Sequence, residues 1–244
     1  MKACSQSIKI PSGLSPPLSH FETGKIYEIF GRPGIGKTQL CLQLCLNLQR
    51  FSHDSPTAFY FDTEGGFSME RVIEMATSLA PSDSFSEPIE ISNIRIFRTF
   101  GLLDFMRNFK DVENYIDENS NVKLIVIDSL SFPIRCFGGT MTERNRLIKP
   151  FLQKLVLVAI KFALVIVVVN HVTTRRKNDN TFRIESKMGL NNNKTEEEFE
   201  SIADTRIKMN WVGNKRMATN VKSGEAKPFR IDGNGVFPEI KTIF

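Results

Sequence analysis

The feature that most constrains this chain is a glycine-rich octapeptide between an apolar segment and a helical one. Its residues are Gly31, Arg32, Pro33, Gly34, Ile35, Gly36, Lys37 and Thr38, which match the pattern G-x-x-x-x-G-K-[ST] throughout. Residues 25–30 (KIYEIF) before it predict a strand, and residues 38–50 after it predict a helix. Glycines let successive N–H groups point into such a loop, and the helix start adds partial positive charge. The pattern therefore predicts a phosphate-binding loop.

The last two residues of this loop have separate expected roles. We expect the Lys37 ammonium to bridge the β- and γ-phosphates of ATP and to be needed for catalysis, and the Thr38 hydroxyl to bind Mg²⁺. Asp128 ends an apolar segment, KLIVID at 123–128, that predicts a buried strand. A carboxylate there is placed to hold the same Mg²⁺ directly or through water. These residues predict ATP and Mg²⁺ as cofactors.

A second acidic candidate follows the predicted strand TAFYFD at 57–62, in the sequence DTEGGF. The carboxyl ends of parallel strands meet at one edge of a sheet, so Glu64 is expected near the phosphate loop. A carboxylate in that position can orient and deprotonate the water that attacks the γ-phosphate. Asp62 is an alternative for this role, or it caps the turn.

Strands and helices alternate from residue 25 onward, which predicts an α/β fold with a mostly parallel sheet flanked by helices. Short antiparallel strands are expected near the C-terminal end, at 204–211, 217–221 and 228–231. We expect residues 1–24 to be a short lead-in and 25–244 a single domain, which suits a chain of 244 residues that is 41% hydrophobic. The apolar run 155–169 contains Lys161 and falls short of the ~20 residues that a bilayer requires, so no membrane partner is expected.

Four segments together resemble the RecA/RadA recombinase family, and especially the eukaryotic recombinase paralogues without an N-terminal domain. They are the phosphate loop with the following Gln39, the segment AFYFDTEGGF, the segment LIVIDS, and VVVNHVTT at 167–174. The resemblance implies a RecA-like P-loop ATPase core in which Glu64 is the catalytic glutamate. Gln39 would lie beside the nucleotide, and Arg71 would pack on the adenine. His171 stands where recombinases usually have a glutamine that senses the γ-phosphate.

The resemblance also implies two DNA-binding loops, at residues 132–146 and 173–200. Basic side chains in them would neutralise phosphates of single-stranded DNA. The candidates are Arg135, Arg144, Arg146, Arg175, Arg176, Lys177, Arg183 and Lys187. The alternative is a solvated charged loop, and the acidic residues 196–198 weaken the electrostatic argument for DNA.

As a whole, the resemblance implies an ATPase of homologous-recombination DNA repair that acts on a recombinase filament, together with a heteromeric paralogue or mediator partner. Three alternatives stay open: a strand-exchange recombinase in its own right, a scaffold that binds ATP without using hydrolysis, and a ring-forming relative of the helicase or clock type. A nuclear location is implied, or a cytoplasmic one if the source is prokaryotic.

Overall fold

The computed structural model describes residues 8–51, 56–79, 89–176, 182–186 and 201–239. Its main sheet has the strand order β12-β11-β10-β9-β3-β7-β6-β4-β5, and β8 pairs with β7 outside this path. Six neighbouring strands run parallel: β5 (Ile94–Arg98), β4 (Thr57–Asp62), β6 (Val122–Asp128), β7 (Val165–Arg176), β3 (Lys25–Gly31) and β9 (Thr205–Val212). The predicted mostly parallel sheet is confirmed.

The sheet continues beyond β9 in antiparallel pairing, as the sequence predicted for this end of the chain. These strands are β10 (Lys215–Asn220), β11 (Ala226–Asp232) and β12 (Gly235–Pro238). Three short antiparallel strands were expected at this end of the chain, and the structure has four with β9. The additional one is β12, whose four residues include a glycine and a proline and carry little periodic signal.

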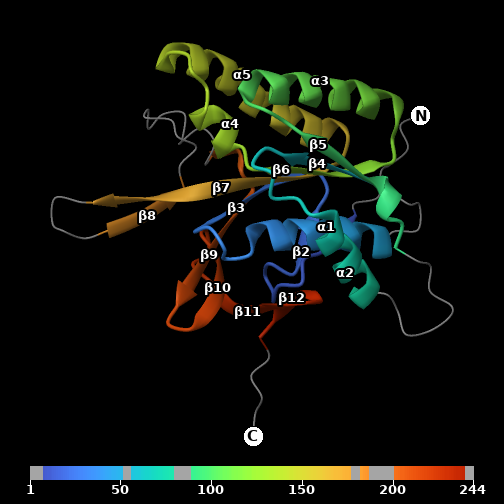
Figure 1. Ribbon diagram of the computed structural model, residues 1–244, viewed down its shortest axis with the longest axis vertical. Coiled ribbons are helices and arrows are strands. Elements are labelled where there is room, and N and C mark those ends of the chain that lie inside the picture. Colours follow the sequence, from blue (N-terminus) through green and yellow to red (C-terminus); the bar gives the residue numbers. More distant parts are fainter. Residues whose placement is uncertain (1–7, 52–55, 80–88, 177–181, 187–200, 240–244) are drawn as a thin grey trace, which may run out of the picture.

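Helices cover both faces of the sheet (Figure 1). On one face lie α1 (Lys37–Arg50) and α2 (Met69–Leu79), and on the other lie α3 (Leu102–Glu118) and α5 (Met141–Lys161). The short helices η1 (Ile91–Asn93) and α4 (Ser131–Arg135) precede β5 and α5. Each face has its own apolar core, so β4 and β6 are buried from both sides, and their near-continuous apolar sequences follow from that position. None of the described helices is both long and apolar enough to cross a membrane.

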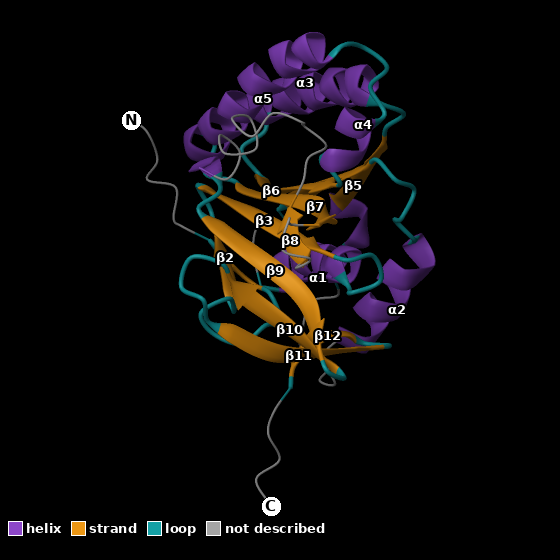
Figure 2. Ribbon diagram, turned by 90° about the vertical axis from the view of Figure 1, so that its left-hand side faces the viewer, coloured by secondary structure: helices purple, strands orange, loops and turns teal. Residues whose placement is uncertain are grey.

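Residues 8–24, which the sequence set apart as a lead-in, belong to the same core as the rest of the domain. They form an antiparallel hairpin of β1 (Lys9–Pro11) and β2 (His20–Glu22), of which β2 is labelled in Figure 2. Its apolar side chains Ile10, Leu18 and Phe21 are almost completely buried in the cluster that also contains α1. The structure therefore has no domain boundary at residue 24.

Two amide side chains of α1 bind the two ends of the described chain. Asn47 Nδ2 donates to the carbonyl of Pro11 at 2.7 Å. One turn earlier, Gln43 exchanges two hydrogen bonds with Val236, donating to its carbonyl at 2.8 Å and accepting from its N–H at 2.5 Å. The N-terminal hairpin and the C-terminal strand β12 are thus both attached to α1.

The predicted DNA loops have more regular structure than the sequence indicated. Strand β7 runs on to Arg176 and pairs antiparallel with β8 (Phe182–Ser186), with Arg175 opposite Arg183. The expectation of a long loop from residue 173 is corrected for residues 173–176 and 182–186, which are strands. Polar residues can pair as strands even when they form no part of an apolar core. Residues 132–146 contain most of α4 and the first turns of α5, so this segment is largely helical.

Candidate nucleotide site

The phosphate loop connects the central strand β3 to α1, and its glycines have conformations that other residues rarely adopt. Gly34 has a φ of 75° and Gly36 a φ of 111°. A Cβ on Gly36 would also lie 2.0 Å from Cδ1 of Ile231. Neither position accepts a larger residue without rearrangement. The loop therefore leaves the first N–H groups of α1 turned toward the carboxyl edge of the sheet.

Lys37 lies against its own loop. Its Nζ donates to the carbonyls of Gly31 at 2.9 Å and Arg32 at 3.1 Å, and the residue is 6% exposed. Burial lowers the pKa of Lys37, and the carboxylates of Asp128 and Glu64 offset that effect only in part. A buried ammonium with only neutral acceptors in contact is well suited to bind an anion.

Asp128 and Thr38, the two predicted Mg²⁺ ligands, are hydrogen-bonded to each other. Thr38 Oγ1 donates to Asp128 Oδ2 at 2.7 Å, and Tyr60 Oη donates to the same oxygen at 2.7 Å. Burial raises the pKa of Asp128, although both hydrogen bonds act in the opposite direction. Among the described residues, the other oxygen, Oδ1, accepts no hydrogen bond.

The donor set fits Mg²⁺ bound together with a phosphate. A hydroxyl and a carboxylate lie side by side, and Mg²⁺ usually takes one or two protein ligands and fills its octahedron with water and phosphate oxygens. Within the described ranges, no cluster of three or more His, Cys, Asp or Glu residues exists that would make an all-protein metal site.

Of the two acidic candidates after β4, Asp62 is occupied by the turn itself. Its carboxylate accepts the N–H groups of Gly65 at 2.8 Å, Gly66 at 3.0 Å and Phe67 at 3.3 Å, and it pairs with Arg98 at 3.2 Å. The residue is 1% exposed. Asp62 therefore caps the turn, which leaves Glu64 as the carboxylate able to meet a water molecule.

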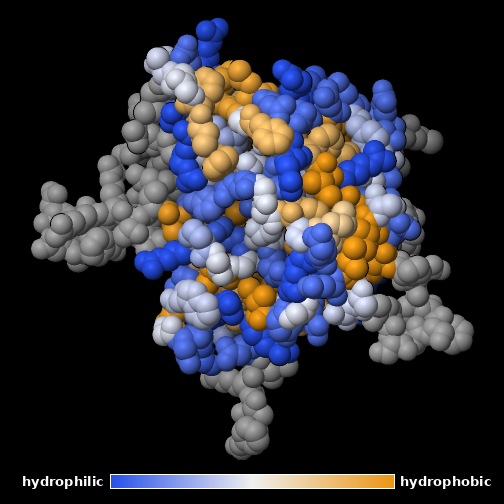
Figure 3. Space-filling view, viewed as in Figure 1, coloured by the Kyte–Doolittle hydropathy of each residue, from blue (hydrophilic) through white to orange (hydrophobic). Residues whose placement is uncertain are grey.

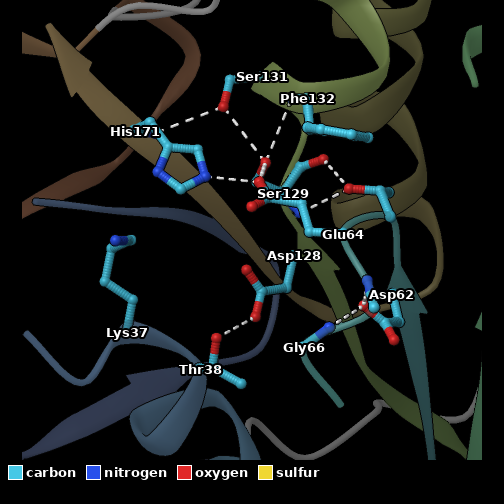
Figure 4. A network of polar contacts seen from close by, with 12 residues as sticks. Lys37, Thr38, Asp62, Glu64, Gly66, Asp128, Ser129, Ser131, Phe132 and His171 are labelled. Carbon is cyan, nitrogen blue, oxygen red and sulfur yellow. Dashed lines mark hydrogen bonds and ion pairs between the residues drawn. The ribbon is translucent and has the colours of Figure 1, made fainter. Parts of the chain in front are cut away.

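Glu64 is held through one of its two oxygens (Figure 4). Oε1 accepts a hydrogen bond from Ser129 Oγ and lies 2.5 Å from His171 Nε2. Burial raises the pKa of Glu64, but the hydrogen bonds from His171 and Ser129 outweigh it, and the pKa lies below its ordinary value. Oε2 has no hydrogen-bond partner among the residues described. The carboxylate is thus ionised at neutral pH and presents one unshared oxygen.

The network around Glu64 reaches the starts of both predicted DNA loops. Ser129 Oγ lies 3.2 Å from Ser131 Oγ and accepts the Phe132 N–H at 3.2 Å, and Ser131 Oγ accepts the His171 N–H at 3.4 Å. Ser129 and Ser131 flank the beginning of α4, while His171 lies on β7 at the base of the hairpin. Figure 4 shows this chain of contacts directly above the Thr38–Asp128 pair.

Arg71 lies beside the phosphate loop, on α2. Its Nε donates to Gln39 Oε1 at 3.1 Å, and its terminal nitrogens donate to the carbonyls of Asp232 at 2.7 Å and Gly233 at 2.9 Å. Asp232 ends β11, and Gly233 belongs to the turn that leads to β12. In the structure this turn packs on the chain's own Arg71, beside its own phosphate loop.

The basic DNA candidates fall into three groups. Arg135 is exposed at the end of α4, and its charge helps to lower the pKa of Glu64. Arg144 and Arg146 lie in the first two turns of α5. Arg175, Arg176 and Arg183 are on the β7–β8 hairpin, whereas Lys177 and Lys187 are outside the described residues. Figure 1 shows the hairpin projecting from the body at the edge where the parallel strands end.

Sequence reasoning did not find Ser129 or Tyr60 as parts of the site. Ser129 follows Asp128 directly, but a serine at a strand end carries no specific signal. Tyr60 did carry a signal. It is two residues before Asp62 in the same strand, and side chains two residues apart in a strand lie on the same face of the sheet.

The Rad51 family model matches residues 18–195, which is well over half of the chain. The chain belongs to the Rad51 family.

Individual relatives match between 62% and 86% of this chain. DNA repair protein RAD51 homolog 3 of Dictyostelium discoideum is 33% identical over 168 residues, covering 62% of this chain and 44% of that protein. The protein of the same name from Cricetulus griseus is 26% identical over 235 residues, covering 86% of this chain and 62% of its own length. DNA repair and recombination protein RadA of Metallosphaera sedula is 32% identical over 161 residues, or 63% of this chain and 48% of that protein. The chain thus spans about half to three fifths of these relatives.

Proposed function

We propose that this chain is an ATPase of the recombinase-paralogue type that acts in homologous-recombination DNA repair. It would bind Mg²⁺ and ATP, single-stranded DNA and the recombinase, and promote, stabilise or remodel the recombinase filament. The observation that carries the proposal is the Thr38–Asp128 hydrogen bond beside the buried Lys37, in a chain of the Rad51 family. Relatives named as DNA repair proteins support the cellular role.

In this proposal the chain's own groups divide the work of hydrolysis. Lys37 exchanges its two backbone carbonyls for phosphate oxygens and neutralises their charge. Glu64 keeps Oε1 on Ser129 and His171 and uses Oε2 to orient the attacking water and take its proton. Mg²⁺, when bound at Thr38 and Asp128, supplies further charge neutralisation on the phosphates. Arg71 and Gln39 would border the adenine.

Contacts with a partner protein are supported by apolar side chains at the surface. Hydrophobic residues reach the surface in several patches separated by hydrophilic ones (Figure 3). Three of the most exposed are Phe100 at 83%, Leu157 at 68% and Ile160 at 66%. Leu157 and Ile160 are three residues apart on α5 and so share one face of that helix, and contiguous exposed apolar surface is typical of protein interfaces. This surface suits the proposed heteromeric partner.

Nucleotide binding and turnover of the purified chain test the ATPase part. We expect Lys37→Ala to weaken ATP binding more than tenfold, and Glu64→Gln to preserve binding while lowering turnover about a hundredfold. Lys222→Ala, at an exposed lysine in a turn, is the control and should change neither. Wild-type binding equal to that of Lys37→Ala would contradict the proposal.

Electron microscopy with single-stranded DNA and ATP separates the alternatives. We expect no filament from the chain alone and a change in the length or stability of the filament formed by its cognate recombinase. A continuous filament from the chain alone would identify a strand-exchange recombinase, and closed hexamers a ring-forming relative. Full rescue of repair in cells by both Lys37→Ala and Lys37→Arg would identify a scaffold.

A further inference from the structure

A buried tyrosine hydroxyl lies beside the candidate magnesium ligands. Tyr60 is in the middle of β4 and is completely buried. Strand β4 pairs in parallel with β6, and Asp62 is directly opposite Asp128. Because side chains alternate along a strand, Tyr60 lies on the same face as these two residues, the face covered by α1. The phenol therefore points along the sheet toward Asp128.

The contact that results is specific to one carboxylate oxygen. Tyr60 Oη donates to Asp128 Oδ2 at 2.7 Å, and this oxygen also accepts the Thr38 hydroxyl at 2.7 Å. The rings of Phe67 and Tyr60 pack in a T-shaped arrangement with centroids 5.1 Å apart, which helps to fix the tyrosine. Two donors on Oδ2 leave Oδ1 as the oxygen without a described hydrogen bond.

Packing alone does not account for this hydroxyl. The neighbours of Tyr60 on β4 are Phe59 and Phe61, both buried, and a phenylalanine would fill the same volume. A hydroxyl in such a core is costly unless it is hydrogen-bonded. Its partner here is a carboxylate that the cation site would use, and hydrogen bonds to charged groups are the stronger kind.

We propose that Tyr60 is a positioning residue of the magnesium site, which holds Oδ2 of the Asp128 carboxylate beside Thr38 and so would leave Oδ1 available to the cation. The inference rests on the proposed function of this site. With its proton held on Oδ2, the Thr38 hydroxyl has its lone pairs free for a metal ion. Without Tyr60, the carboxylate is free to turn about its Cβ–Cγ bond and exchange its two oxygens. Tyr60 is completely buried and acts on the site through Asp128.

The substitution that isolates this role is Tyr60→Phe, and the chain provides a matched control. Tyr27 is also buried, at 5% exposure, and its hydroxyl accepts the Glu22 N–H at 2.8 Å, in the N-terminal hairpin. Tyr27→Phe therefore removes a buried, hydrogen-bonded hydroxyl that contacts neither Asp128 nor Thr38. The measurement is the binding of a fluorescent ATP analogue, titrated with Mg²⁺ and repeated in EDTA.

We expect Tyr60→Phe to raise the Mg²⁺ concentration for half-maximal binding about tenfold, and to change binding in EDTA less than twofold. Tyr27→Phe should match the wild type in both conditions. A folded Tyr60→Phe protein with an unchanged Mg²⁺ requirement would overturn the inference. Wild-type protein that binds no nucleotide would overturn the proposed function, and the inference with it.

A measurement on the unsubstituted chain covers the case in which Tyr60→Phe does not fold. The sequence has three tyrosines, so incorporation of 3-fluorotyrosine gives three fluorine NMR signals. Two of them are assigned with Tyr27→Phe and Tyr115→Phe, and the third belongs to Tyr60. We expect Mg²⁺, added to the ATP-bound protein, to shift the Tyr60 signal and to leave that of Tyr27 in place. A Tyr60 signal that does not respond to Mg²⁺ would overturn the inference.

Discussion

Glu64 and Asp128 share one arrangement at the residue scale: two donors converge on a single oxygen of each carboxylate. For Glu64 the donors are Ser129 and His171, and for Asp128 they are Thr38 and Tyr60. A carboxylate anchored in this way cannot rotate freely, so its second oxygen has a fixed direction. The order required of a hydrolytic site is therefore present in hydrogen bonds within the chain.

The pH dependence of hydrolysis tests the anchoring of Glu64. Removing a donor from a carboxylate raises its pKa, and a general base must be ionised, so Ser129→Ala should move the acid limb of the rate profile to higher pH. Ser131→Ala is the control, because its hydroxyl touches Ser129 and the His171 N–H but not Glu64. Equal profiles for Ser129→Ala and wild type would contradict the role of this hydrogen bond.

The lowered pKa of Glu64 also makes the stability of the fold depend on pH. Because the folded-state pKa of Glu64 lies below the unfolded value, the ionised carboxylate contributes stability at neutral pH. That contribution is lost as the pH falls through the lowered pKa, below the ordinary value of 4.5. The free energy of unfolding should therefore fall less between neutral pH and this acid range in Ser129→Ala than in the wild type.

At the scale of elements, the N-terminal hairpin is an integral part of the domain. Phe21 is completely buried, and the centroid of its ring lies 4.2 Å from the centroid of the Tyr27 ring. We expect Phe21→Ala to lower the free energy of unfolding by about 3–5 kcal/mol, as for other buried phenylalanines. Phe100→Ala, at an exposed phenylalanine, should cost no more than about 0.5 kcal/mol. Urea denaturation measures both, and equal values would show that the hairpin contributes nothing to the core.

The sequence predicted the elements that have a strong period or a specific motif. The strands β3, β4 and β6, the helix α1 and the phosphate loop were predicted because apolar runs and the glycine pattern mark them directly. The hairpin at residues 8–24 was missed because its strands have three residues each, too few to show alternation. The β7–β8 pairing was missed because most of its residues are polar and give no apolar pattern. Amino-acid composition does not predict the register between two strands.

At the scale of the whole molecule, α1 joins the hairpin, the parallel core and the antiparallel strands. Its amides hold Pro11 and Val236, and its apolar residues pack under β6 and β7. We therefore expect one cooperative unfolding transition. The single tryptophan, Trp211, lies on β9 in the extension of the sheet, so its fluorescence reports that region, and circular dichroism reports all helices. Transitions at different urea concentrations would show that the antiparallel strands unfold separately.

The hydrogen bonds of α1 with Pro11 and with Val236 also affect the order in which the fold can form during synthesis. Pro11 leaves the ribosome before α1 is complete, whereas Val236 follows Gln43 by 193 residues. A nascent chain can therefore cover one flank of this helix at once, but the other flank stays open until almost every described residue has been translated. Among the described contacts of α1, docking of β12 is therefore the one that forms last during synthesis.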